Sequence, residues 1–270
     1  MRHLITIDLD GTLLDRQGCV SGRSKTVIDR IRALGHVVVI ATGRPFSGAI
    51  PKYERLGLDT PLITDNGGSI QNPVDPSFPR QRTSIPKNIM HDLFRFSKDM
   101  LDSAFFSLDD VVYAYKYERR LEAFFAETNP SGVVIEQPFD TLDVEPSGII
   151  FLVQAPHVKA FENHIDTVLS HTLSYRLWGT DMKHAIYEVY LRHISKASAI
   201  RYLLNHYGID ASAWIAFGDG TNDVEMIRDA AIGVAMRNAC DEVKEVSDDM
   251  TSHDNADDGV ARWLEEHFGL

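Results

Sequence analysis

The chain has 270 residues with 27 Lys and Arg against 39 Asp and Glu, a formal net charge of −12. Hydrophobic residues make up 44% and charged residues 24%, which is ordinary globular composition and excludes a mainly disordered chain. The acidic balance argues against nucleic acid and anionic membranes as partners, because both are negative themselves, but not against a small phosphorylated ligand.

Short aliphatic runs, each followed by polar residues, predict strands that are buried on both faces, as in a parallel sheet. They lie at residues 4–7, 37–40, 62–64, 214–217 and 231–234. After the first run, Ser21 can cap a helix that continues to Leu34, and Gly35 can end it. Pro45 suits the opening of another helix. The alternation of strand and helix predicts a doubly wound α/β domain.

The middle of the chain has a different pattern. Three prolines in residues 72–79 predict a surface turn. Beyond it we expect helices after Pro86 to about Met100, at 118–127 and at 157–170, and strands at 104–107, 111–115, 133–135, 148–153, 173–178 and 185–191. This order predicts an α+β insert of roughly 100 residues, a common domain size. We therefore expect a core at 1–82 and 190–270, interrupted by an insert at 83–189.

Polar residues follow four of the predicted strands. They are Asp8-Leu9-Asp10-Gly11-Thr12, Thr42-Gly43-Arg44, Asp65-Asn66-Gly67-Gly68 and Gly218-Asp219-Gly220-Thr221-Asn222-Asp223. Open α/β sheets bind ligands beyond the carboxyl ends of their strands, so these segments are expected to meet at one edge.

Asp8 and Asp10 can share one small site, and their mutual repulsion there is relieved by a divalent cation. Asp219 and Asp223 supply further hard oxygen ligands, which suit Mg²⁺. Asp8 can then attack phosphorus, while Asp10 protonates the leaving alkoxide and later activates water. A calcium loop does not fit, because its glycine belongs at the sixth place and here it is fourth. Gly11 permits a sharp turn, and the Thr12 hydroxyl can fix it. A plain Asx turn stays open as an alternative for this motif alone.

Phosphate ligands are expected from the other segments. The Thr42 hydroxyl and the Gly43 amide precede a helix whose N-terminus favours anions. Taken alone, Thr42 is better explained as a simple helix cap. Asn222 can donate to phosphate. Lys196 opposes the helix dipole in a first turn, which indicates a bound anion, with a solvated surface lysine as the alternative. Arg44 suits either the substrate or an ion pair.

The ends of the chain and its cysteines indicate an intracellular setting. The apolar N-terminal stretch stops at Asp8, short of the 7–15 residues or so of a secretory signal, and no stretch reaches the roughly 20 apolar residues of a membrane span. Cys19 and Cys240 form neither a disulfide framework nor a metal-ligand pattern. We therefore expect a cytoplasmic protein, and the oligomeric state is not indicated.

The four segments, in this order, resemble the motifs of the haloacid dehalogenase superfamily of phosphotransferases, and the insert resembles its type IIB cap. Ala41-Thr42-Gly43-Arg44-Pro45, Asn66-Gly67-Gly68 and residues 217–223, 230–236 and 246–260 are similar to the Cof-type sugar phosphatases. The resemblance implies a mostly parallel, Rossmann-like core and a cap that closes over the site and sets specificity. In the alternating run at 186–191, Glu188 could bind a sugar hydroxyl, but we expect it to face solvent.

Roles for individual residues follow from the resemblance. It implies Asp8 as nucleophile and Asp10 as general acid and base. It implies Mg²⁺ on Asp8, the Asp10 carbonyl and Asp219, with Asp223 in support. The implied phosphate ligands are the Leu9 amide, Thr42, Gly43, Lys196 and Asn222.

Three functions compete. The first is a Mg²⁺-dependent phosphatase that acts on small phosphomonoesters, above all sugar phosphates, through an aspartyl-phosphate. The second is a phosphomutase with the same core chemistry. The third is a non-catalytic phospho-acceptor module, which would be about half this length and would lack the insert.

Overall fold

The computed structural model of the chain describes residues 1–109, 111–119 and 131–270, and these fall into two units. The first consists of Met1–Arg44, Ala49–Gln81 and Ser195–Leu270, and the second of Pro45–Gly48 and Arg82–Ile194. The domain boundaries expected from the sequence stay a prediction, because compactness does not show that either part folds alone. In the described part of the chain, no helix combines the length and apolarity needed to cross a bilayer.

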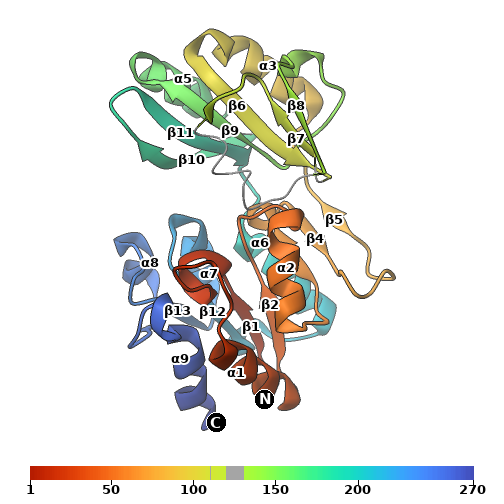
Figure 1. The fold of residues 1–270 in the computed structure, drawn as a ribbon, viewed down its shortest axis with the longest axis vertical. Helices are drawn as coiled ribbons and strands as arrows, with labels where there is room; N and C mark the ends of the chain where they lie inside the picture. The colour runs from red at the N-terminus through yellow and green to blue at the C-terminus, as the bar shows by residue number, and fades with distance from the viewer. Residues whose placement is uncertain (110, 120–130) are drawn as a thin grey trace. The chain divides into compact units, whose positions relative to one another are not determined.

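A five-stranded parallel sheet forms the centre of the first unit (Figure 1). Its strands, in spatial order, are β14 (Asp249–Met250), β13 (Ile232–Ala235), β12 (Trp214–Gly218), β1 (Leu4–Ile7) and β2 (Val37–Ile40). Every residue of β1 and β2 is buried, as continuous aliphatic runs require when helices cover both faces of a sheet. The predicted parallel sheet is therefore confirmed.

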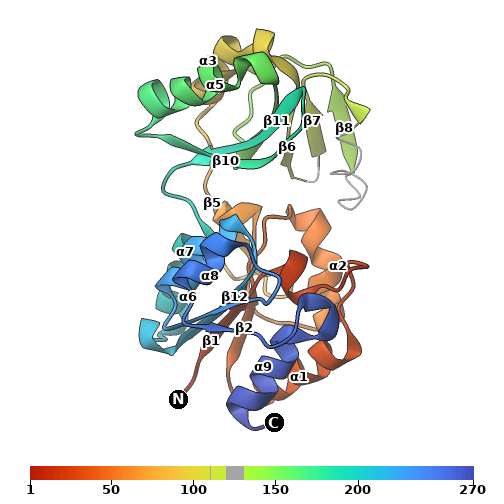
Figure 2. The same cartoon turned by 90° about the vertical axis from the view of Figure 1, so that its left-hand side faces the viewer.

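Helices flank this sheet on both sides. They are α1 (Gly22–Ala33), α2 (Phe46–Leu56), α6 (Lys196–Tyr207), α7 (Val224–Asp229), α8 (Asp241–Val246) and α9 (Gly259–Phe268). In Figure 2, α1 and α9 lie on one side of the sheet and α6, α7 and α8 on the other. Ser21 caps α1 by accepting from the Ser24 amide at 2.9 Å, and Gly35 has a φ of +90°, so both predicted ends of this helix are confirmed.

The run at 62–64 was expected in the parallel sheet, and this is wrong. It forms β3 (Leu62–Thr64) of a separate three-stranded sheet with β4 (Ser69–Gln71) and β5 (Gln81–Arg82), and a single parallel bridge between Ala41 and Ile63 adjoins it to β2. At the turn that follows, Asp65 and Asn66 have φ of +52° and +54°, and the chain reverses so that β4 pairs antiparallel with β3.

The second unit is an α+β structure with a six-stranded sheet. In spatial order the strands are β10 (Leu173–Thr180), β11 (His184–Leu191), β9 (Gly148–Gln154), β6 (Leu101–Leu108), β7 (Val111–Ala114) and β8 (Gly132–Ile135). Helices α3 (Lys87–Ser97) and α5 (Val158–His164), the latter extended by a wider turn over Ile165–Leu169, cover one face. The predicted helix at 118–127 lies, from residue 120 onward, outside the described residues.

Glu188 corrects one expectation for this unit. Strand alternation suggested a solvent-facing carboxylate, yet Glu188 is only 7% exposed. The register of β10 against β11 places it opposite Arg176, whose Nη1 lies 2.9 Å from Glu188 Oε2, and Trp178 Nε1 donates to the same oxygen at 3.2 Å. Strand pairing decides this contact, so the sequence of one strand could not reveal it.

Candidate active site

Asp8 lies at the carboxyl end of the central strand β1. Its amide still donates to the Phe217 carbonyl of β12 at 3.1 Å, so the parallel ladder continues up to this residue. The side chain is buried. The ladder therefore aims the Asp8 carboxylate at the edge where the neighbouring strand β12 also ends.

The next residues form a tight turn that touches the loop after β12. Gly11 has a φ of +71°, and a Cβ built there would lie 2.1 Å from Asp219 Oδ2. Glycine is thus required both by the backbone and by the space. The Thr12 hydroxyl donates to Asp219 Oδ1 at 2.8 Å. This hydroxyl therefore ties two loops together, whereas it was expected to fix its own turn.

Lys196 joins this cluster from the first turn of α6. Ser195 caps the helix, accepting from the Ser198 amide at 3.2 Å. Lys196 is completely buried, and its Nζ lies 2.6 Å from Asp8 Oδ1 and 2.6 Å from Asp223 Oδ1. The alternative of a solvated surface lysine is wrong. A position in the first turn of a helix does not reveal which loops will pack against that side chain.

Asp223 organises the loop after β12. Its Oδ2 accepts from the amides of Asp219 and Gly220, both at 3.0 Å, while its Oδ1 receives Lys196. Both carboxylate oxygens are therefore engaged within the protein. Asp223 is fully buried and shapes the turn that presents Asp219.

The buried charges do not balance. The Lys196 ammonium pairs with the buried carboxylates of Asp8 and Asp223, and the half-buried carboxylate of Asp219 lies beside them. Burial raises the pKa of Asp8 well above its usual range, and Asp223 and Asp219 add to this rise while Lys196 opposes it. Burial, together with Asp223, raises the pKa of Asp219 to about 6. Burial lowers the pKa of Lys196, but the charges of Asp223 and Asp8 outweigh it, so that the pKa rises to about 12.

This imbalance fits a divalent cation. Among the described residues, one group of carboxylates could hold a metal: oxygen atoms of Asp8, Asp219 and Asp223 lie within 4.8 Å of one another. Hard carboxylate oxygens are the ligands that Mg²⁺ and similar cations prefer, and the cation would offset the surplus negative charge.

Asp10 is separated from this group by its ion pair with Arg44. Arg44 Nε lies 2.7 Å from Asp10 Oδ2 and Arg44 Nη2 lies 2.6 Å from Asp10 Oδ1, a two-pronged geometry. The Asp10 side chain is 56% exposed and that of Arg44 13%. Of the two roles left open for Arg44, the structure displays the ion pair.

Two of the predicted phosphate ligands, Leu9 and Thr42, follow the strands β1 and β2. Leu9 begins the turn after Asp8 with its side chain buried, so only its main chain is suited to a ligand. Thr42 is buried, and its Oγ1 accepts from the Arg44 amide at 3.1 Å. It does not cap α2, which begins at Phe46, so the helix-cap alternative is wrong.

Asn66 also lies at this edge, and no role for it was expected from the sequence. It is buried, and its Oδ1 accepts from Asn222 Nδ2 at 3.0 Å. A Cβ built at Gly43 would lie 3.0 Å from the same oxygen, so Gly43, Asn66 and Asn222 are neighbours. The signal in the sequence was the Asn66-Gly67 pair, because asparagine followed by glycine is typical of a turn with positive φ, as found here.

Comparisons with known proteins agree with this geometry. Residues 5–264 match the family described as haloacid dehalogenase-like hydrolase. The 5-amino-6-(5-phospho-D-ribitylamino)uracil phosphatase YitU of Bacillus subtilis (strain 168) is 32% identical over 270 residues, covering 99% of this chain and 98% of that protein.

Two solved structures share the fold. A haloacid dehalogenase-like hydrolase from Bacteroides thetaiotaomicron superposes with a TM-score of 0.84 at 24% identity, covering 99% of this chain and 100% of that one. The subclass IIB sugar phosphatase BT4131 superposes with a TM-score of 0.81 at 23% identity, covering 100% and 99%. The predicted fold class, a haloacid dehalogenase core with an inserted α+β cap, is thereby confirmed. The chain belongs to the haloacid dehalogenase superfamily, as a Cof-type member with the subclass IIB fold, and it is a phosphatase that acts on phosphoric monoesters.

Proposed function

We propose that this phosphatase is Mg²⁺-dependent and hydrolyses small phosphomonoesters of polyhydroxylated carbon chains, sugar phosphates among them, through an aspartyl-phosphate. The observation that carries the proposal is the buried cluster in which Asp8 meets Lys196 and lies beside the carboxylates of Asp219 and Asp223. It joins a nucleophile, a fixed cation and oxygen ligands for a metal at one strand end.

The chain's own residues divide the reaction between them. A carboxylate oxygen of Asp8 forms a bond to phosphorus as the bond from phosphorus to the ester oxygen breaks. Asp10 gives its proton to the departing alkoxide. A water molecule then attacks the aspartyl-phosphate, Asp10 takes the proton from that water, and phosphate leaves with the Asp8 carboxylate restored.

Binding groups complete the site. We assign the phosphate oxygens to the Leu9 amide, Thr42, Gly43, Lys196 and Asn222. Asp8, Asp219, the carbonyl of Asp10 and, in support, Asp223 would hold Mg²⁺. When bound, the metal would screen the nucleophile from the negative phosphoryl group.

Release of Asp10 from Arg44 is a requirement of this scheme. A carboxylate held by a two-pronged arginine pair cannot pass a proton to an alkoxide. We therefore propose that the described pair is a resting arrangement, and that Asp10 turns toward the ester oxygen when the substrate is present.

The substrate class is proposed on chemical grounds. The relative YitU is named for a 5-phosphoribityl compound, which is a phosphate ester of a polyol chain. Sugar phosphates share that chemistry. The proposal assigns the choice between them to the predicted cap, residues 83–189, and a cytoplasmic metabolite is the expected source.

The experiment replaces the nucleophile. Asp8→Asn keeps the shape of the side chain but weakens it as a nucleophile, so release of phosphate from p-nitrophenyl phosphate and from a panel of sugar and ribityl phosphates should fall to background. Asp29→Asn makes the same chemical change on α1, where Asp29 pairs with Lys25 at the surface, and should leave turnover unchanged. Turnover by Asp8→Asn at the wild-type rate would refute the proposal. Product analysis separates hydrolysis from transfer, because a phosphomutase would yield an isomeric sugar phosphate in place of free phosphate.

A further inference from the structure

The loop after β13, residues 236–240, is hydrogen-bonded to the loop that presents Asp219. The Met236 amide donates to the Gly218 carbonyl at 3.0 Å, and the Cys240 amide donates to the Asp219 carbonyl at 2.9 Å. The two strand-end loops therefore form one connected unit of backbone. Asn238 stands in the middle of this loop.

Asn238 extends the connection to the loop that carries the nucleophile. Its Nδ2 donates to the Gly11 carbonyl at 2.7 Å, and its Oδ1 accepts from the Asn255 amide at 3.1 Å. Asn255 in turn donates from Nδ2 to the Leu14 carbonyl at 2.7 Å. Two asparagines from the C-terminal part of the chain thus hold two carbonyls of the turn that follows Asp8.

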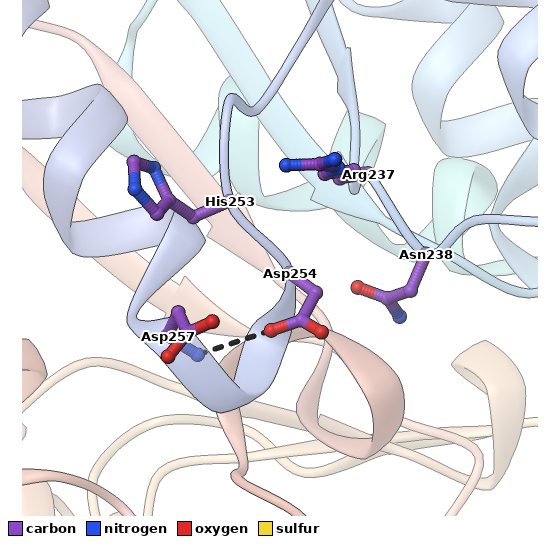
Figure 3. Close-up of a pocket in the computed structure, with 5 residues that line it drawn as sticks. All are labelled: Arg237, Asn238, His253, Asp254 and Asp257. Atoms are coloured by element: carbon purple, nitrogen blue, oxygen red, sulfur yellow. Dashed lines mark hydrogen bonds between the residues drawn. The ribbon is translucent and has the colours of Figure 1, made fainter.

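Asn238 also lines a pocket. Asn238 lines a cavity of about 310 Å³ together with Arg237, His253, Asp254 and Asp257 (Figure 3). The Arg237 side chain, from the same loop, donates from Nη1 to the Ser252 carbonyl at 3.1 Å. The two neighbours therefore make different contacts, Arg237 within the C-terminal segment and Asn238 to the nucleophile turn.

Asn238 contacts the peptide group of Gly11, a residue whose own side chain cannot restrain the backbone. Gly11 has a φ of +71° and no side chain to limit rotation, so glycine at this position has access to many backbone conformations. The side chain of its neighbour Asp10 is more than half exposed and is held by the ion pair with Arg44, which restrains the side chain and not the Gly11 peptide. Asn238 holds the carbonyl of this peptide, and the Thr12 hydroxyl, on the following residue, holds the turn against Asp219.

We propose that Asn238 is a positioning residue for catalysis: by holding the Gly11 carbonyl it fixes the backbone that aims Asp10 at the ester oxygen and at the attacking water. The inference rests on the proposed function, because it assumes Asp10 as general acid and base. Asn238 itself touches neither substrate nor reacting atoms. Its effect passes through one peptide group.

The choice of substrate makes the inference testable. A p-nitrophenolate leaves without being protonated, so the first half of the reaction with p-nitrophenyl phosphate does not need Asp10. The second half, attack of water on the aspartyl-phosphate, does. An alkyl phosphate such as a sugar phosphate needs Asp10 in both halves.

Two variants remove the donor. Asn238→Ala deletes both contacts, and Asn238→Asp keeps the size and the acceptor for Asn255 but cannot donate to the Gly11 carbonyl. In both we expect kcat for a sugar phosphate to fall about 10- to 100-fold, as small displacements of catalytic groups do, with KM within about 2-fold. Single-turnover release of p-nitrophenol should stay within about 3-fold of wild type. Arg237→Ala, the matched control, should behave as wild type in both measurements.

Failure of the proposed phosphatase function and failure of the positioning role of Asn238 give different results. Inactive wild-type protein, or an Asp10→Asn variant with wild-type turnover of sugar phosphates, would contradict the proposed function. If wild type is active and Asp10→Asn is not, the Asn238 variants decide. Unchanged kcat in both would overturn the positioning role. So would an equal loss in p-nitrophenol release and in sugar phosphate turnover, because that pattern reports general damage to the fold.

Discussion

Lys196 shows how a single side chain sets the electrostatics of the site. A buried ammonium is tolerated only when its charge is met, and here Asp8 and Asp223 each approach its Nζ to 2.6 Å. The same ammonium cannot also neutralise Asp219. Burial and the charge of Asp223 raise the pKa of this third carboxylate to about 6, so a cation beside it would offset charge that Lys196 leaves unpaired.

Gly11 supports a prediction at the same scale. Gly11→Ala should combine two penalties, a positive φ and a Cβ that would displace the Asp219 carboxylate. Gly18 has the same φ of +71° with nothing within 4 Å of a built Cβ, so Gly18→Ala should carry the backbone penalty alone, about 1–2 kcal/mol. Both variants should lose stability in denaturant unfolding, but only Gly11→Ala should lose phosphatase activity. Full activity in Gly11→Ala would show that Asp219 does not depend on this contact.

The N-terminus of α6 is the element that delivers Lys196. Ser195 and Ser198 form a capping box, and Gly208, with a φ of +60°, ends the helix. The turn after β3 packs on this helix start, where a Cβ built at Gly67 would lie 2.3 Å from the Ser195 carbonyl oxygen. Helix α6 is thus positioned by its cap and by a loop that is 128 residues away in sequence, at Gly67.

A comparison of two helix caps tests this. Ser195→Ala and Ser21→Ala each remove a side-chain oxygen that accepts from the third helical amide, and each should cost about 1 kcal/mol of folding stability. Only the first lies next to Lys196, so kcat should fall severalfold in Ser195→Ala and stay at the wild-type value in Ser21→Ala. Thermal unfolding and steady-state kinetics on both proteins provide the measurement. Equal kinetics in the two variants would argue that Lys196 is held by its ion pairs alone.

For the molecule as a whole, repulsion among the carboxylates of Asp8, Asp219 and Asp223 lowers stability, and a bound cation would reduce that repulsion. The pKa of Asp219 is raised from 3.8 to about 6 in the folded, metal-free protein, so the folded state holds this proton more tightly than the unfolded chain. The associated stability is present below about pH 4 and is lost as the pH rises through about 6. A shift of this size corresponds to about 3 kcal/mol at most.

Stability should therefore depend on pH and Mg²⁺ together. At pH 8, saturating Mg²⁺ should raise Tm by about 5–10 °C, and at pH 5 by much less, because protons compete for the same oxygens. Asp219→Asn should be more stable than wild type at pH 8 without metal and should respond little to Mg²⁺. Thermal melts at both pH values, with and without EDTA, provide the measurement. An equal Mg²⁺ shift in wild type and Asp219→Asn would place the metal elsewhere.

Many of the strands and helices can be predicted from short stretches of the sequence. Aliphatic runs such as Val37–Ile40 predict buried strands because only a covered sheet hides four consecutive apolar side chains, and Ser21 and Gly35 mark the ends of α1 through the backbone groups that they satisfy. The same local logic predicted that Asp8 and Asp219 would meet, since parallel strands end at one edge. Chemistry that follows from strand ends is therefore accessible from the sequence.

Other features depend on which segments pack together, and this could not be predicted from the sequence. The sequence left a surface position open for Lys196, which α6 buries against Asp8, and it predicted a solvent-facing Glu188, which lies opposite Arg176. Asn238 has no local signature at all, since its partner Gly11 is 227 residues away. Backbone propensity and apolar periodicity act over a few residues and so determined the strands and helices, whereas side-chain pairing acts across space, and only the tertiary structure decided which charges and amides share the site.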